Sequence, residues 1–350
     1  MTGRSLSRAT GRRATLPLGR FMLVVLLTFA ALCVLAVAAP QSDYIRWQNL
    51  QGTIFSRASW IYERLHFDPA PVDVVFLGSS RVGAAVLPTQ LEPALRARGV
   101  NLRVANFSLP SSGFDIRETI LNQVFADKAP KLIVYSVVEA FPRDGHDAFG
   151  DLGSVGEVLS SPWIVNRNLP GNLARLPVRQ LQLALASAAP DAYGMVGTFD
   201  AAAYPGSTID PRQLMGFDED VAKLDTAEHL ETLTRQAAKR RREITPPLLP
   251  ASLSWIEFGI SQTYVMRMLD AAEAHGAKVS FLFLPFFTGP EQPLERDWLE
   301  ARAPLWRATF MREDPRSYTD SAHISSAPEI KSAMTEWLAD RIVESLGDGG

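Results

Sequence analysis

Short continuous runs of apolar residues alternate with longer segments of helical character in the first half of the chain. The apolar runs cover 72–77, 102–107 and 131–138, and the segments at 87–98 and 115–125 have helical spacing. A continuous β-branched and aromatic run is typical of a strand that is buried on both faces of a parallel sheet. The pattern therefore predicts β-α-β-α-β with right-handed crossovers.

The same alternation resumes near the carboxyl end. We expect a helix at 261–275, a strand at 278–287, a helix at 295–305, a short strand at 308–312 and a closing helix at 327–346. Between the two parts, residues 145–250 are rich in Gly, Pro and short helical pieces, and we interpret them as a cap-like insertion. The predicted fold is one α/β domain over 72–346: a doubly wound, flavodoxin-like parallel sheet of about five strands with helices on both faces.

The most apolar segment is 21–39, which contains no charge. A helix of that length spans roughly 28 Å and can cross a membrane. All charges in the tail at 1–20 are arginines, so the positive-inside rule predicts a cytoplasmic tail, a single-pass anchor in the plasma (inner) membrane and an extracytoplasmic, periplasmic domain. A cleaved secretory signal is the alternative, because Ala36-Val37-Ala38 resembles a small-residue cleavage site.

A juxtamembrane segment at 40–71 links the anchor to the domain. It contains Trp47, Trp60 and Tyr62. These aromatic residues fit either a belt at the membrane interface or packing against the following domain, and the sequence leaves both open.

Composition excludes several classes of site. One cysteine, Cys33, cannot form a disulfide framework or a zinc ribbon, and the five histidines include no pair at helical metal-binding spacing, so we expect neither a metal nor another cofactor. Five of the 35 basic residues lie in the first twenty positions, which leaves 30 against 38 acidic residues in the remainder. This acidic balance argues against a nucleic-acid partner.

Two hydroxyl residues follow the first strand, in Gly78-Ser79-Ser80-Arg81. In open parallel sheets the ligand site lies outside the carboxyl ends of the strands, where helix amino termini can stabilise an oxyanion. A serine here fits a nucleophile, but it equally fits a helix N-cap. The motif is neither a G-x-S-x-G elbow nor a phosphate loop.

Asp320 and His323 lie between the last predicted strand and the closing helix, so they belong to the same edge of the sheet. Within one turn, this spacing lets a carboxylate accept the Nδ1 proton of the imidazole and leaves Nε2 free to take a proton from a serine. A serine after the first strand combined with D-x-x-H before the last helix predicts a serine-nucleophile site.

This combination resembles the SGNH, or GDSL-like, hydrolase superfamily. The resemblance implies Ser80 as nucleophile, His323 as general base and Asp320 as its orienting partner, with Ser79 in place of the usual aspartate. The Gly-Ser-Ser version with an amino-terminal anchor resembles the branch that includes the D-alanyl transfer protein of teichoic acid synthesis and the alginate O-acetylation proteins.

The other family blocks match less well. The resemblance places the second block at 106–113, where the backbone N–H of Ser108 would join that of Ser80 as an oxyanion donor and Asn106 would contact substrate. The third block has no asparagine, since 136–141 reads Ser-Val-Val-Glu-Ala-Phe. Arg81 would hold a carboxylate or phosphate of the substrate, or pair with an acid such as Glu139.

The leading hypothesis is a membrane-anchored serine O-acyltransferase or acyl esterase that acts on carbohydrate through acyl-Ser80. By the same resemblance, a multispanning membrane acyltransferase would supply the acyl group. The missing asparagine favours the alternative of a non-catalytic, SGNH-like scaffold or binding protein of a polysaccharide assembly complex. The basic run at 239–242 fits either a solvated helix face or a contact with an anionic glycan.

Overall fold

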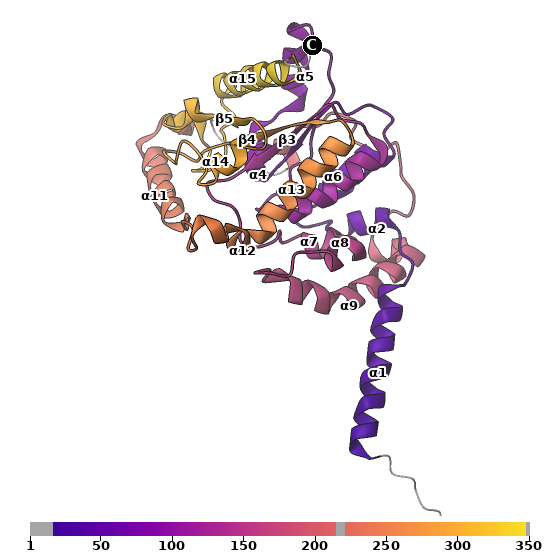
Figure 1. Ribbon diagram of the computed structural model, residues 1–350. Helices are drawn as coiled ribbons and strands as arrows, with labels where there is room; N and C mark the ends of the chain where they lie inside the picture. The colour runs from indigo at the N-terminus through magenta and orange to yellow at the C-terminus, as the bar shows by residue number, and fades with distance from the viewer. Residues whose placement is uncertain (1–16, 215–220, 348–350) are drawn as a thin grey trace, which may run out of the picture.

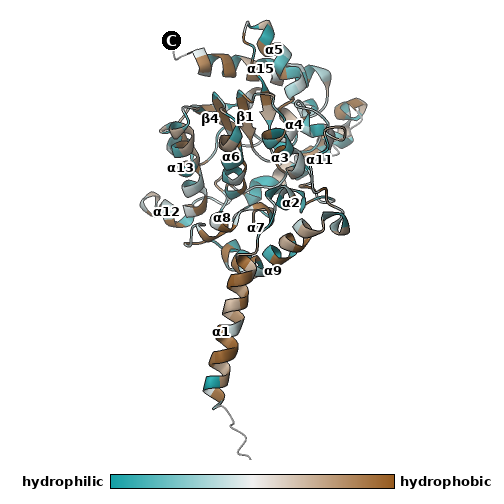
Figure 2. Ribbon diagram, turned by 90° about the vertical axis from the view of Figure 1, so that its right-hand side faces the viewer, coloured by the Kyte–Doolittle hydropathy of each residue, from teal (hydrophilic) through white to brown (hydrophobic). Residues whose placement is uncertain are grey.

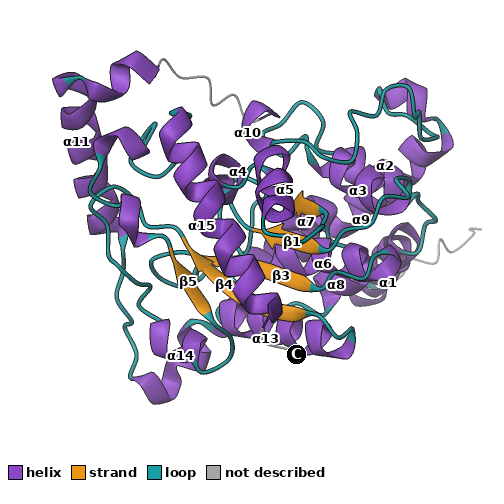
Figure 3. Ribbon diagram, turned by 90° about the horizontal axis from the view of Figure 1, so that it is seen from above, coloured by secondary structure: helices purple, strands orange, loops and turns teal. Residues whose placement is uncertain are grey.

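The first three strands lie within the predicted apolar runs, and all of their residues are buried. The computed structural model describes residues 17–214 and 221–347. Its sheet is parallel throughout, in the order β2-β1-β3-β4-β5 (Figure 3). The strands are β1 (Val74–Leu77), β2 (Val104–Asn106), β3 (Leu132–Val137), β4 (Lys278–Phe283) and β5 (Leu305–Arg307). This confirms the predicted α/β class and the flavodoxin-like strand order.

Alternate residues of each strand face opposite helical layers. In β1, Val74 and Phe76 pack on one side while Val75 and Leu77 pack on the other. The first layer contains α4 (Ser80–Ala85), α5 (Pro88–Ala97) and α15 (Pro328–Gly347), and the second contains α3 (Ala58–His66), α6 (Asp115–Asp127) and α13 (Gly259–Ala274). Both faces of the sheet are therefore covered, as predicted, and Figure 1 shows α13 and α6 side by side over one of them.

The last strand is not where the sequence predicted it. Residues 308–312 include a 3₁₀ turn at Thr309–Met311, and β5 lies just before it, after the short helix α14 (Arg296–Glu300). In β5 only Trp306 is buried, because β5 is an edge strand with a single neighbour. Three residues with one buried side chain do not produce a recognisable apolar run, which explains the wrong prediction.

The connection from β3 to β4 spans residues 138–277 and does not form one compact cap. It holds α7 (Phe149–Leu152), α8 (Val155–Leu159), α9 (Asn168–Ala188), α10 (Pro211–Leu214), α11 (Ala227–Glu243) and α12 (Ser254–Glu257). Its early part packs beside α2 (Asp43–Gln48), and Tyr204 donates to Asp68 at 2.7 Å. Its later part, α11, returns to the carboxyl edge of the sheet, where His229 Nε2 lies 2.9 Å from the Tyr318 carbonyl oxygen.

The apolar amino-terminal segment forms α1 (Leu18–Val37), a helix of 20 residues with none buried. It projects from the domain as a stem (Figures 1 and 2). Among the described residues it is the one helix whose length and composition allow it to cross a membrane. It begins three residues before the predicted segment, and residues 1–16 of the predicted tail lie outside the described residues.

The juxtamembrane segment packs against the domain. Trp47 and Trp60 are buried in the core beside the sheet, which supports the packing interpretation over an interfacial belt for these two residues. Arg57 donates from its two terminal nitrogens to the carbonyl oxygens of Ser108 and Asn106, both at 2.8 Å. The segment between α1 and the domain therefore also fixes the loop after β2.

Gly78 ends β1 at a point of close approach. A Cβ on this residue would lie 2.3 Å from Val82 Cγ2 and 2.9 Å from Ser136 Cβ. We predict that Gly78→Ala lowers the free energy of unfolding by about 2 kcal/mol, because either α4 or β3 must move. Urea unfolding followed by tryptophan fluorescence measures this change.

Gly171→Ala in α9 is the matched control, because a Cβ there meets no atom within 4 Å. We expect this variant to be as stable as the wild type or slightly more stable, since alanine favours helix. Equal stability of the two variants would contradict the close approach at Gly78.

Candidate active site

Ser80 and His323 meet at the carboxyl edge of the sheet. Ser80 is the first residue of α4, directly after β1, and His323 lies in the loop before α15. The distance from Ser80 Oγ to His323 Nε2 is 2.7 Å. The two residues are 243 positions apart in the chain, so the fold rather than local sequence creates this hydrogen bond.

Asp320 orients the imidazole. Its Oδ2 lies 2.8 Å from His323 Nδ1, while its Oδ1 accepts the backbone N–H groups of Ala322 at 2.8 Å and of His323 at 3.0 Å. Burial raises the pKa of Asp320, but the hydrogen bond and charge of His323 together with the backbone donors outweigh it and lower the pKa to about 2. An ionised Asp320 assigns the proton to Nδ1 and leaves Nε2 as the acceptor for the Ser80 hydroxyl.

The two serines of the motif divide the two roles that the sequence allowed. Ser79 is the N-cap of α4, and its hydroxyl accepts the backbone N–H of Arg81 at 3.4 Å. Ser80 takes the hydrogen bond to His323. The first N–H groups of a helix have no partner within it, so the backbone N–H of Ser80 is positioned to serve as an oxyanion donor.

Ser108 and Asn106 are completely buried and make hydrogen bonds other than the predicted contacts. The backbone N–H of Ser108 donates to Asn106 Oδ1 at 3.1 Å. Asn106 Nδ2 donates to the carbonyl oxygens of Val82 and Val86 at 3.0 and 2.9 Å. Asn106 thus fastens α4 to β2 instead of contacting a substrate, and the Ser108 N–H is already occupied.

Arg81 forms an ion pair with Glu139, one of the two alternatives predicted for it. Its guanidinium donates to the two carboxylate oxygens of Glu139 at 2.5 and 3.1 Å and to the Leu284 carbonyl oxygen at 3.0 Å. Glu139 stands in the third-block loop, where the resemblance would place asparagine. Arg81 therefore links the loop after β1 with Glu139 after β3 and with Leu284 after β4.

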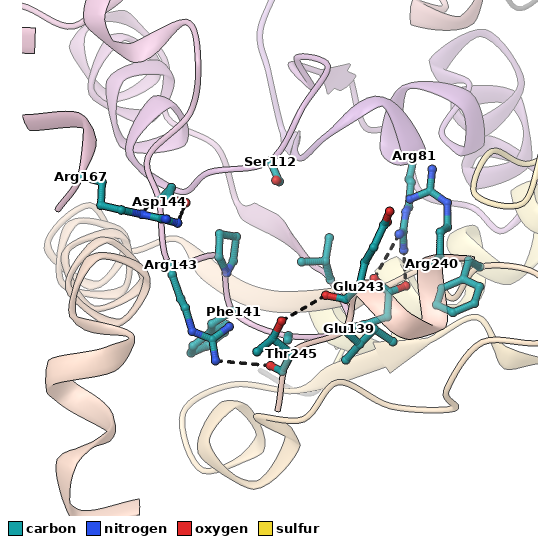
Figure 4. A pocket seen from close by; sticks show the side chains of 15 residues that line it. Arg81, Ser112, Glu139, Phe141, Arg143, Asp144, Arg167, Arg240, Glu243 and Thr245 are labelled. Carbon is teal, nitrogen blue, oxygen red and sulfur yellow. Dashed lines mark hydrogen bonds and ion pairs between the residues drawn. The ribbon is translucent and has the colours of Figure 1, made fainter. Parts of the chain in front are cut away.

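The cleft over Ser80 and His323 has a volume of about 320 Å³. An adjoining pocket of about 350 Å³ shares its lining of Arg81, Ser112, Val138, Glu139 and Arg240 (Figure 4). Ser111 and Ser112 come from the loop after β2, a few residues beyond the predicted Ser108. Ser111 has a positive φ of 73°, which turns this loop over the site.

Arg240 reaches the cleft from α11. Its Nε donates to Ser321 Oγ at 2.9 Å, next to Asp320 in the same loop. Burial lowers the pKa of Arg240, as does the charge of Arg81. Figure 4 shows its side chain alongside Arg81 at one end of the adjoining pocket. Of the basic run, this residue faces the site, whereas the side chain of Lys239 is 80% exposed.

His146 supports the loop that carries Ser111 and Ser112, and its ring nitrogens are both occupied by backbone groups. Its Nε2 lies 2.6 Å from the Pro110 carbonyl oxygen, and its Nδ1 accepts the backbone N–H of Ala148 at 3.0 Å. Burial lowers the pKa of His146 to about 4, so it is neutral at pH 7. Only glycine fits at position 113 beside His146, because a Cβ there would lie 2.4 Å from the backbone nitrogen of His146.

No family model and no curated protein matches the chain. The function is therefore inferred from the geometry of the site. Among the described residues there is no group of three or more His, Cys, Asp or Glu side chains that could hold a metal ion. What the arrangement offers is a hydroxyl, an imidazole and a carboxylate in series at the wall of an open cleft. This series can generate a serine nucleophile.

We predict that Asp320 stabilises the fold only while it is ionised. Its folded pKa lies below the ordinary value of 3.8, so its contribution is complete above pH 4 and is lost as the pH falls through about 2. Allowing for solvent screening of a side chain that is 37% exposed, we expect wild type to exceed Asp320→Asn by about 1 kcal/mol at neutral pH.

Urea unfolding of both proteins at a series of pH values tests this prediction. The difference in unfolding free energy should shrink between about pH 4 and pH 2. A difference that stays constant over this range would show that the Asp320 charge plays no part.

Proposed function

We propose that this protein is a serine-dependent acyl transferase or esterase with Ser80 as nucleophile, His323 as general base and Asp320 as the residue that orients His323. The observation that carries the proposal is the continuous series of hydrogen bonds, 2.7 Å from Ser80 to His323 and 2.8 Å from His323 to Asp320. The series ends at the wall of the cleft, where a substrate carbonyl can approach the hydroxyl.

The chemistry follows from these positions. Ser80 Oγ attacks the carbonyl carbon of an acyl ester while His323 Nε2 takes the hydroxyl proton, and the negative charge moves to the carbonyl oxygen. The backbone N–H of Ser80 stabilises that oxygen. When the carbon–oxygen bond to the leaving alcohol breaks, His323 returns the proton to it and acyl-Ser80 remains. An acceptor hydroxyl then gives its proton to His323 and attacks the acyl carbon, the bond from that carbon to Ser80 Oγ breaks, and His323 returns the proton to Ser80 Oγ.

Transfer to a carbohydrate hydroxyl fits the site better than rapid hydrolysis. The third-block loop contributes Glu139, paired with Arg81, instead of an asparagine amide. Losing one oxyanion donor costs about 2.7 to 4 kcal/mol of transition-state stabilisation for attack by water and by an acceptor alike, so an acceptor that is bound and oriented in the cleft gains over water. The polar cleft, lined by Ser111, Ser112 and Arg240, suits a hydroxyl-rich and partly anionic acceptor.

We further propose that α1 anchors the chain in the plasma membrane with the domain on the outer, periplasmic side. The exposed apolar helix and the arginines before it support this orientation. Free acyl-CoA is a cytoplasmic donor, so a multispanning membrane acyltransferase would deliver the acyl group, as the resemblance to the D-alanyl and alginate systems implies.

One observation favours a non-catalytic scaffold as the second candidate. The backbone N–H of Ser108, the second expected oxyanion donor, is occupied by Asn106. A protein that only binds glycan would need no oxyanion donors, although it would also need no aligned serine and histidine.

A fluorophosphonate probe separates these two candidates. We predict that the full-length protein in detergent is labelled and that Ser80→Ala lowers the labelling rate roughly 10³-fold or more. Ser79→Ala is the matched control. It removes the helix cap, which costs about 1 kcal/mol of stability, and leaves the nucleophile in place, so labelling should persist.

Intact-protein mass spectrometry measures the labelling. Absence of label on the folded wild type would favour the scaffold. Equal labelling of Ser80→Ala and wild type would show that the nucleophile is another residue.

A further inference from the structure

The exposed face of α9 is apolar. Val178, Leu181 and Leu185 expose 60%, 50% and 50% of their surface, and Ala174 and Ala188 are also exposed. Their spacing of four, three, four and three residues places all five on one side of the helix. Helices of soluble domains normally turn charged and polar residues to this side.

The buried face of α9 is mixed, because Leu169, Leu176, Leu183 and Ala186 lie on it together with polar residues. Asn172, Arg179 and Gln180 are buried, and Arg179 donates to the Gly150 carbonyl oxygen at 2.6 Å and to Gln180 Oε1 at 3.2 Å. The helix is thus apolar on its outer face as well as over much of its inner face, where a helix between a protein core and water would turn polar residues outward. A second apolar environment must cover its outer face.

The position of α9 identifies that environment. Its inner face packs against α2, α7 and α8, and its middle shares a cluster with Val37 at the end of α1, through Leu173 and Leu176. The Ser187 hydroxyl accepts the backbone N–H of Ser42 at 2.8 Å. Figures 1 and 2 both show α9 running across the end of α1, below α2, α7 and α8 and on the side from which α1 projects.

The residues shortly before α9 in the chain are also apolar and exposed. Trp163, Ile164 and Val165 are 76%, 50% and 46% exposed. Arg167 and Arg175 are exposed near them, although Arg167 also pairs with Asp144. Tryptophan and leucine beside arginine are the composition of helices that lie in the interface of a membrane.

We infer that α9 and the preceding 163–165 segment form a second membrane contact, lying on the lipid surface at the point where α1 leaves the bilayer. Val178, Leu181, Leu185 and Trp163 enter the boundary between headgroups and acyl chains, and Arg175 contacts phosphate groups. The inference rests on the proposed anchoring by α1 and is independent of catalysis. The membrane-spanning helix α1 and the surface contact of α9 together fix the orientation of the domain relative to the membrane, which α1 alone does not.

Depth-dependent quenching tests this contact in the full-length chain. The chain is reconstituted in phosphatidylcholine–phosphatidylglycerol vesicles with a bimane fluorophore at Leu181→Cys, in a Cys33→Ser background. Glu231→Cys is the matched control, because Glu231 lies on α11, away from α1, with its side chain 80% exposed. Leu185→Cys serves as a second probe position.

We expect brominated lipid to quench the probes at 181 and 185 at least about twofold, iodide to quench them weakly, and the probe at 231 to behave in the opposite way. Iodide quenching at 181 and 185 equal to that at 231 would overturn the inference. Probes shielded from both quenchers would also overturn it, by showing that protein covers the face.

Separate readouts distinguish this failure from failure of the proposed function. Flotation of the protein with the vesicles reports anchoring by α1, and fluorophosphonate labelling of Ser80 in the same vesicles reports the catalytic site. Protein that fails to float would overturn the anchor and the inference together. Protein that floats and is labelled, with its α9 probes open to iodide, would overturn the inference alone.

Discussion

The hydrogen bond between the Ser80 hydroxyl and the His323 imidazole depends on the order of the strands. With β1 inside a parallel sheet, Ser80 emerges at the carboxyl edge, and the chain passes β4 and β5 before it returns to that edge with His323. Two further contacts hold the returning loop in place: Phe287 donates its backbone N–H to the Ser321 carbonyl oxygen at 2.8 Å, and Tyr318 pairs with Ile324 across the loop. The site is therefore a consequence of the sheet and not of either loop alone.

Buried polar groups hold the walls of the cleft so that the reacting groups need little rearrangement. Arg57 ties the loop after β2 to the segment that follows α1, and burial lowers its pKa to about 9, so it still carries charge at pH 7. Asp115 accepts the backbone N–H of His146 at 2.8 Å on the other side of the same loop. Fixed dipoles around a nucleophile are the main means by which enzymes stabilise a developing charge. The cost of burying these groups is consistent with a site that must hold its geometry.

The sequence predicted the parts of this arrangement that local pattern encodes. β1 and β3 are continuous apolar runs buried on both faces, and the spacing of Asp320 and His323 is that of one turn. The sequence did not predict how Asn106 would be used, because a buried strand amide that bonds two carbonyl oxygens at α4 has no local signature. Arg240 was visible only as part of a basic run, since its approach to the site depends on the course of the long β3–β4 connection.

Taken together, the alignment of hydroxyl, imidazole and carboxylate, the polar cleft and the apolar stem favour acyl transfer at a membrane surface. The most direct test is to mix the full-length protein with p-nitrophenyl acetate, quench it with acid within one turnover and map the acetyl group by peptide mass spectrometry. We expect an acetyl group on Ser80 that does not accumulate in His323→Ala. Release of p-nitrophenol with the acetyl group on a different residue, or without any acyl-protein, would contradict it.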